Sequence, residues 1–105
     1  MGCAGLQSVT IEEGVQTIGE GAFSECRGLT SITIPNSVTK IETYAFYCCT
    51  GLAEITSRAT TAPQLGNSVF EYVDDNGKLY IPSGATGYNA WTDVLPSSWE
   101  LININ

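Results

Sequence analysis

The sequence predicts a mainly β solenoid, a stack of 23-residue units closed by a C-terminal cap that contains a short helix. Two observations lead to this prediction. Residues of the same type recur every 23 positions, and short apolar runs of period two alternate with turn residues. A chain of 105 residues is long enough for a core but short for two domains. We therefore expect one domain over 1–105, stacked as rungs.

The repeat is clearest in the first half of the chain. The first two units share their cysteine, glycine, leucine and phenylalanine positions, which a single constant step relates: Cys3 and Cys26, Gly5 and Gly28, Leu6 and Leu29, Phe23 and Phe46. After one inserted residue the pattern returns at Phe70, Leu79 and Ile81. The predicted divisions are repeat 1 (3–25), repeat 2 (26–48), a divergent repeat 3 (49–71), and a partial rung with the C-terminal cap (72–105).

Each unit is expected to contribute two short strands. In the second unit the first strand covers 29–34, with its isoleucines on the inner face. Pro35 ends this strand because proline has no N–H to donate to a ladder. The second strand-like piece, 38–41, leads into a turn that directs Phe46 into the interior. No unit could bury its apolar face alone, so the units must stack.

The C-terminal segment is expected to cover the last rung. Tyr88, Trp91 and Leu95 have helical spacing, which predicts a short helix with its rings on the core. Residues 99–104 are then expected to form a final strand. The divergent third unit, with Ser57 in place of an isoleucine, fits a rung close to the end of the stack.

The run 22–46 reads Ala-Phe-x-x-Cys-x-Gly-Leu-Thr-x-Ile-x-Ile-Pro-x-Ser-Val-x-x-Ile-x-x-x-Ala-Phe. It resembles the BspA-type leucine-rich repeat of bacterial surface and secreted proteins. The resemblance covers about 3–58, more weakly Leu79–Pro82, and 59–105 is similar to the capping segment of such proteins from Bacteroides-like bacteria. It implies a right-handed leucine-rich-repeat stack, an extracellular or cell-surface location, and non-enzymatic adhesion to an extracellular protein of the host matrix or cell surface.

Charge and composition exclude several classes of function. The net charge of −7 disfavours nucleic acid and anionic membrane surfaces as partners. The apolar runs are too short for membrane insertion of this segment, and its first residues lack the pattern of a signal peptide. Because the chain starts in the middle of the repeating pattern, we expect it to be a fragment of a longer protein.

The sequence favours neither an enzyme nor a cofactor. Without histidine, no Ser-His or Cys-His nucleophile can form within the chain. Asp74, Asn76 and Gly77 have the spacing of part of a calcium loop, but Tyr72 and Ser83 stand where that loop needs ligands. We therefore expect no metal, and a tight turn in which Asn76 and Gly77 adopt positive φ.

The four cysteines do not predict a disulfide framework. Cys3, Cys26 and Cys49 share one repeat position that points into the core, so we expect buried, reduced thiols there. Cys48 stands where the first unit has Glu25, and we expect a more exposed and reactive thiol. Its redox state stays open.

The outward residues of the first strands are the best candidate site. The repeat step aligns them in rows, which predicts a flat, uncharged, hydroxyl-rich strip suited to an extended protein partner. The same residues would also suit any exposed strand, because β-branched side chains fit the pleat. The candidate ligand contacts are Thr10, Thr30, Ser31, Thr33, Glu54, Thr56 and Tyr80.

Three other possibilities stay open. The rings of Tyr80, Tyr88, Trp91 and Trp99 would form a carbohydrate-binding module if they were exposed. The chain could instead be a purely structural end-cap of a longer array. Finally, the apolar side chains of the first rung predict end-to-end self-association through an uncapped face made of Leu6, Val9, Ile11 and Phe23.

Overall fold

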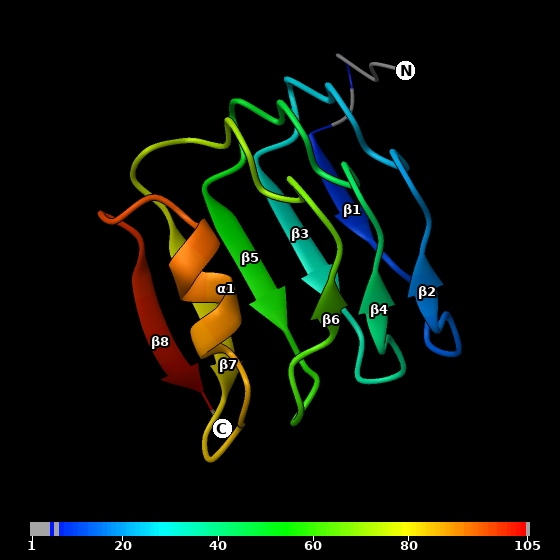
Figure 1. Cartoon of the computed structure of the whole chain (residues 1–105), viewed down its shortest axis with the longest axis vertical. Helices are drawn as coiled ribbons and strands as arrows, with labels where there is room; N and C mark the ends of the chain where they lie inside the picture. Colours follow the sequence, from blue (N-terminus) through cyan, green and yellow to red (C-terminus); the bar gives the residue numbers. More distant parts are fainter. Residues whose placement is uncertain (1–4, 6, 105) are drawn as a thin grey trace.

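The computed structural model describes residue 5 and residues 7–104 and shows a β-solenoid of about four turns with one short helix near the C-terminus (Figure 1). The larger of its two sheets has five strands, all parallel, in the order β1-β3-β5-β7-β8. Their bounds are β1 Ser8–Thr10, β3 Ser31–Ile34, β5 Glu54–Ser57, β7 Lys78–Pro82 and β8 Glu100–Ile104. The predicted fold class is confirmed.

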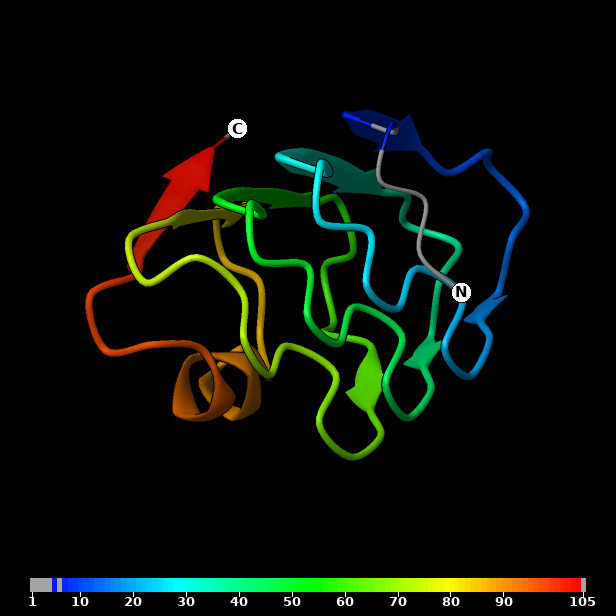
Figure 2. The ribbon, with the colours of Figure 1, turned by 90° about the horizontal axis from the view of Figure 1, so that it is seen from above.

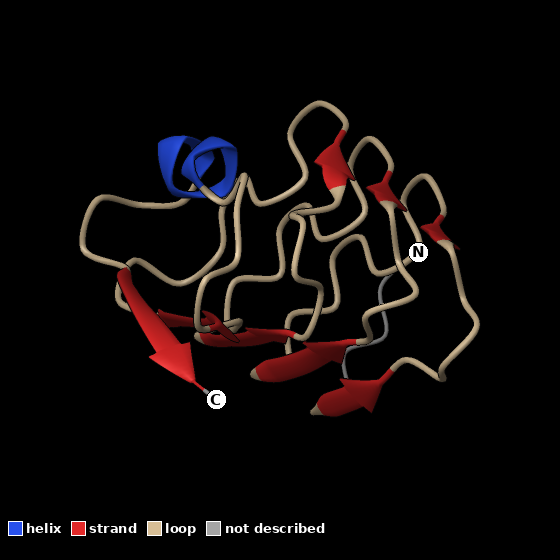
Figure 3. Ribbon diagram, turned by 90° about the horizontal axis from the view of Figure 1, so that it is seen from below, coloured by secondary structure: helices blue, strands red, loops and turns tan. Residues whose placement is uncertain are grey.

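The opposite side of the solenoid carries three short strands, β2 (Thr17–Ile18), β4 (Lys40–Ile41) and β6 (Gln64–Leu65). The helix α1 (Asn89–Val94) lies on this side, as the view from above shows (Figure 2). Turns and loops make up most of each coil (Figure 3). The predicted cap helix and final strand are therefore present as α1 and β8.

The strand register places equivalent residues beside one another. Val9 pairs with Ile32, and Ile32 with Ile55, each at the predicted repeat step. Ile55 then pairs with Leu79, which confirms the predicted insertion. β3 and β5 pair residues that are 23 positions apart, ending with Ile34 and Ser57. β4 and β6 pair residues that are 24 positions apart, beginning with Lys40 and Gln64. The extra residue therefore lies between β5 and β6.

The core consists of ladders of like side chains. The Phe23 and Phe46 rings stack with centroids 5.3 Å apart, and Phe46 stacks on Phe70 at 5.8 Å. Trp91 of α1 continues this ladder at 5.3 Å from Phe70 and is fully buried. The helix therefore covers the end of the phenylalanine ladder, as its apolar spacing predicts.

The cap also holds the segment that contains the inserted residue. Tyr88 Oη donates a hydrogen bond to the Ala59 carbonyl at 2.8 Å, and Trp91 Nε1 donates to the Pro63 carbonyl at 3.1 Å. The Tyr88 proton is thereby used, so the buried Ser57 hydroxyl, 2.6 Å from Tyr88 Oη, is the donor of that contact. Ser57 departs from the repeat because its partner is a tyrosine of the cap.

The turn before β7 differs from its expected form. Neither Asn76 nor Gly77 has a positive φ, so that expectation was wrong. Asp74 Oδ1 instead accepts a hydrogen bond from the Asn76 N–H, and the Trp99 indole N–H donates to the Asp74 carbonyl at 2.6 Å. A glycine is needed at position 77 because the Trp99 ring lies where a Cβ would stand.

The cysteine positions agree with the repeat. Cys26 and Cys49 are fully buried, and the Cys49 thiol donates to the Phe23 carbonyl at 3.0 Å. Cys48 is only partly buried and is a free thiol. Cys3 lies outside the described residues. Burial raises the pKa of Cys49 to about 12.

The first rung is less completely covered than the second. Val9, Ile11 and Phe23 are only partly buried, whereas Ile32 and Phe46 are almost inaccessible to solvent. Leu6, the fourth residue expected on this face, lies outside the described residues.

We expect Tyr88→Phe to lower the free energy of unfolding by about 1–3 kcal/mol, because the buried Ser57 hydroxyl and Ala59 carbonyl lose their partner. Urea unfolding followed by circular dichroism measures the change. Tyr80→Phe, which removes a hydroxyl from a partly exposed tyrosine, is the matched control and should change stability little. Equal effects of the two substitutions would contradict this account of the cap.

We expect stability to fall between about pH 9 and pH 12, because the unfolded Cys49 thiol ionises near pH 9 while the folded thiol keeps its proton to about 12. Below about pH 9 both states are protonated, and the contribution is fully present. Urea midpoints measured over this range for the protein and for Cys49→Ala give the two slopes. Parallel pH dependences would show that Cys49 does not contribute.

Candidate functional site

The outer face of the five-stranded sheet brings the predicted contacts together. One register row joins Ser8, Ser31, Glu54, Lys78 and Glu100, and another joins Thr10, Thr33, Thr56, Tyr80 and Ile102. Six of the seven predicted contacts stand in these two rows. The seventh, Thr30, directly precedes β3.

The outer side chains differ in exposure. Thr10 and Glu54 are exposed, and the four other predicted contacts in the rows are partly buried between their neighbours. The exposed Thr30 has a structural task, since its hydroxyl donates to the Gln7 carbonyl at 3.1 Å and its N–H donates to the same oxygen at 2.8 Å. Thr30 therefore joins the first two rungs whether or not a ligand contacts it.

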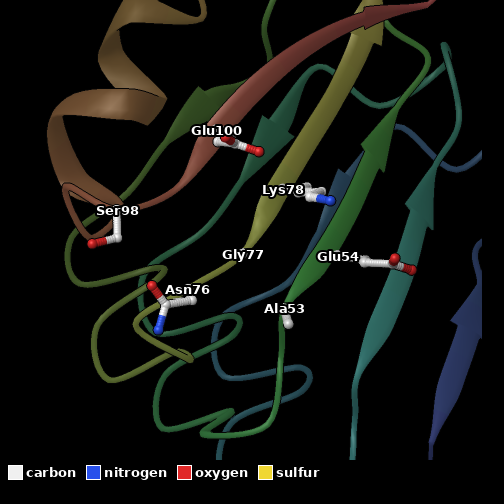
Figure 4. Close-up of a pocket in the computed structure, with 7 residues that line it drawn as sticks. All are labelled: Ala53, Glu54, Asn76, Gly77, Lys78, Ser98 and Glu100. Atoms are coloured by element: carbon white, nitrogen blue, oxygen red, sulfur yellow. The ribbon is translucent and has the colours of Figure 1, made fainter.

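The strip is neither uncharged nor flat at its C-terminal end, so this part of the prediction was wrong. Lys78 follows Glu54 in the row, and Glu100 follows Lys78. Around these side chains lies an open pocket of about 420 Å³ at the beginning of β5, β7 and β8 (Figure 4). Its lining residues are Ala53, Glu54, Asn76, Gly77, Lys78, Ser98 and Glu100.

The charges in this pocket are free to meet a ligand. Lys78 stands between two carboxylates in the row, yet within the described part of the chain it forms no ion pair of 4.0 Å or less. The ammonium and carboxylates can therefore pair with charged or amide groups of a partner. Sequence reasoning missed Glu100 because the step from Lys78 to Glu100 is one residue shorter than the repeat. Lys78 was passed over although the inserted residue that aligns Tyr80 with Thr56 also aligns Lys78 with Glu54. The alignment of Leu79 with Ile55 could have placed Lys78.

The aromatic residues of the cap do not form an exposed platform. Tyr88 and Trp91 are 3% and 0% exposed, and both polar tips bond to the backbone. Trp99 is partly buried, with its indole N–H on Asp74. The carbohydrate hypothesis thus fails for Tyr88 and Trp91, because neither ring is free to stack on a sugar.

Exposed tyrosines lie elsewhere, on the turn segments that follow the short strands. Tyr44 is 45% exposed and Tyr72 61% exposed. Sequence reasoning did not single them out, because equivalent positions of the neighbouring rungs hold other residue types.

Parallel coils of nearly constant length, with one strand of the large sheet per coil and a short helix at the end, define the class of leucine-rich-repeat solenoids. Residues 1–92 match the family described as BspA type leucine rich repeat region (6 copies), and the chain belongs to this family. No curated protein and no solved structure matches the chain significantly.

The family gives a coarse functional class. Its members are typically bacterial surface proteins, and leucine-rich-repeat solenoids typically serve as non-enzymatic scaffolds for protein interaction. In the part of the chain that the structure describes, no helix is long and apolar enough to cross a membrane.

Proposed function

We propose that this chain is a non-enzymatic adhesion module of a bacterial surface or secreted protein, and that it contacts an extracellular protein through the outer face of the five-stranded sheet. The observation that supports this proposal most strongly is the pair of register rows. They align polar side chains from five strands on one continuous face. Family membership supports the location and the class of partner.

The face suits an extended protein ligand for a physical reason. Each strand is fixed by backbone hydrogen bonds to its neighbours, so the side chains are held in place before binding and little conformational entropy is lost. The hydroxyls of Thr33 and Thr56 offer both donors and acceptors, and Lys78 with its flanking carboxylates adds charge selectivity. A host matrix or cell-surface protein is the partner that we propose.

The central test places a charge in the middle of this face. We expect Thr56→Glu to weaken binding to an immobilised preparation of extracellular-matrix proteins by about tenfold, as for a centrally placed interface residue. Thr60→Glu makes the same change on an exposed threonine that lies outside the sheet and should leave binding unchanged. Surface plasmon resonance measures both variants, and urea unfolding checks that both stay folded. Equal binding by the two variants would reject the sheet face as the contact surface.

A structural end-cap is the second candidate, and the burial of Trp91 against Phe70 supports it. In that case the chain terminates an array in a longer protein and contacts no ligand. Deleting it from such a protein would then reduce solubility without changing ligand affinity, whereas the adhesion proposal expects affinity to fall.

We also propose that the first rung pairs with a second copy of the chain. Val9 lies in the edge strand β1, and Val9, Ile11 and Phe23 form a partly exposed apolar face in the described structure. Unpaired strand edges with apolar side chains favour association. We expect light scattering to show a mass that increases towards millimolar protein, and Val9→Lys to suppress the increase. A strict monomer at that concentration would refute the pairing.

A further inference from the structure

A second surface lies on the turn segments that follow β2, β4 and β6, along the upper edge of Figure 1 and side by side in Figure 2. Backbone hydrogen bonds hold the first two segments in register: Gly21 N–H donates to the Thr43 carbonyl at 3.0 Å, and Glu25 N–H donates to the Tyr47 carbonyl at 2.6 Å. Equivalent positions of successive rungs therefore lie next to one another on this edge.

A change in side-chain size between these two segments creates a pocket. Gly21 and Ser24 of the first segment are the equivalents of Tyr44 and Tyr47 in the second. The small residues leave space beside the two tyrosines, and an open pocket of about 560 Å³ results. Glu20 and Glu25 complete its lining.

The tyrosine rings are held in fixed orientations. Tyr44 and Tyr47 pack edge to face with centroids 5.1 Å apart, and Tyr47 packs in the same way against Tyr72 at 5.7 Å. The backbone of Tyr44 has φ 63°, a conformation that is uncommon for a bulky residue and that the neighbouring rung fixes through the bond from Tyr44 N–H to the Asn67 carbonyl. A ligand would find the rings already in place.

The electrostatics of the pocket favour a cation. Its charged lining residues are Glu20 and Glu25, both exposed. Among the described residues neither carboxylate forms an ion pair of 4.0 Å or less. Lys40, which lines another pocket together with Glu20, has its ion pair with Glu42 at 3.7 Å. The faces of tyrosine rings also attract cations through their quadrupole. Carboxylates only accept hydrogen bonds, so the pocket best fits a ligand rich in donors.

We propose that this pocket binds an arginine side chain from a basic, extended segment of a protein partner. A guanidinium group is planar and carries five N–H donors, so it can stack on a tyrosine ring while it bonds to a carboxylate at the rim. Lysine is the weaker fit because its ammonium is compact and strongly hydrated. The net charge of −7 adds attraction for a basic segment. This surface is separate from the sheet face and goes beyond the adhesion proposal.

Three labelled peptides of equal length test the proposal, carrying arginine, lysine or citrulline at the same positions in a glycine-serine background. Citrulline keeps the shape of arginine without its charge. We expect fluorescence anisotropy near physiological salt to rank arginine above lysine and lysine above citrulline. The double substitution Glu20→Gln and Glu25→Gln should weaken binding of the arginine peptide about fivefold, and Tyr44→Leu about threefold.

Two controls separate a built site from general attraction. Glu12→Gln with Glu13→Gln removes the same charge from the turn after β1, outside the pocket lining, and should leave the affinity within about twofold. Thr56→Glu on the sheet face should not weaken it, which distinguishes this site from the adhesion surface. Equal losses for the two glutamate pairs, equal affinity for the citrulline peptide, or displacement by a neutral hexasaccharide would each overturn the proposal.

Discussion

In-register parallel pairing between rungs is the constraint on which the rest of the structure depends. The backbone bonds of both sheets join different rungs, so a rung without neighbours would have neither a ladder nor a covered apolar face. The core ladder follows from the same register, because a ring that recurs at one position must meet its equivalent. The sheet face and the turn pocket also follow from it, since both are rows of equivalent positions. Stability and surface therefore share one geometric cause.

The ladders could be predicted from the sequence because they depend on recurrence alone. Three features could not. The inserted residue was located only by the register, which keeps the repeat step up to Ser57 and exceeds it by one at Gln64. The turn positions with positive φ could not be recognised by glycine residues in the sequence. Tyr44 and Cys48 occupy such positions, where bonds to neighbouring rungs hold the backbone in this conformation. Tertiary context overrides local preference there. The same reasoning explains the turn at Gly77, where a ring rather than φ requires the glycine.

The candidate sites were harder to predict than the core for a reason inherent in repeats. Aligning units emphasises likeness, whereas the pocket on the turn edge exists because Gly21 and Tyr44 are unlike. The charged end of the sheet face arises in the same way. In the row of equivalent residues, the uncharged Ser31 is followed by the charged Glu54 and Lys78. Differences between equivalent positions leave gaps or change charge locally, while identities fill the core. In this chain the informative residues for binding are those that break the repeat.

Breaks in the repeat are not all of one kind, and burial distinguishes them. Ser57 breaks the isoleucine row, but it is fully buried and its hydroxyl is satisfied by Tyr88, so the break is compensated within the fold. Glu20 and Glu25 are exposed, and within the described chain neither carboxylate forms an ion pair of 4.0 Å or less. A buried polar group left without a partner would cost stability, whereas an exposed one costs little and stays available. A buried residue that departs from the repeat and has a polar partner within the fold therefore indicates a structural role. An exposed charged residue that departs from the repeat and forms no ion pair in the described chain indicates where a partner can bind.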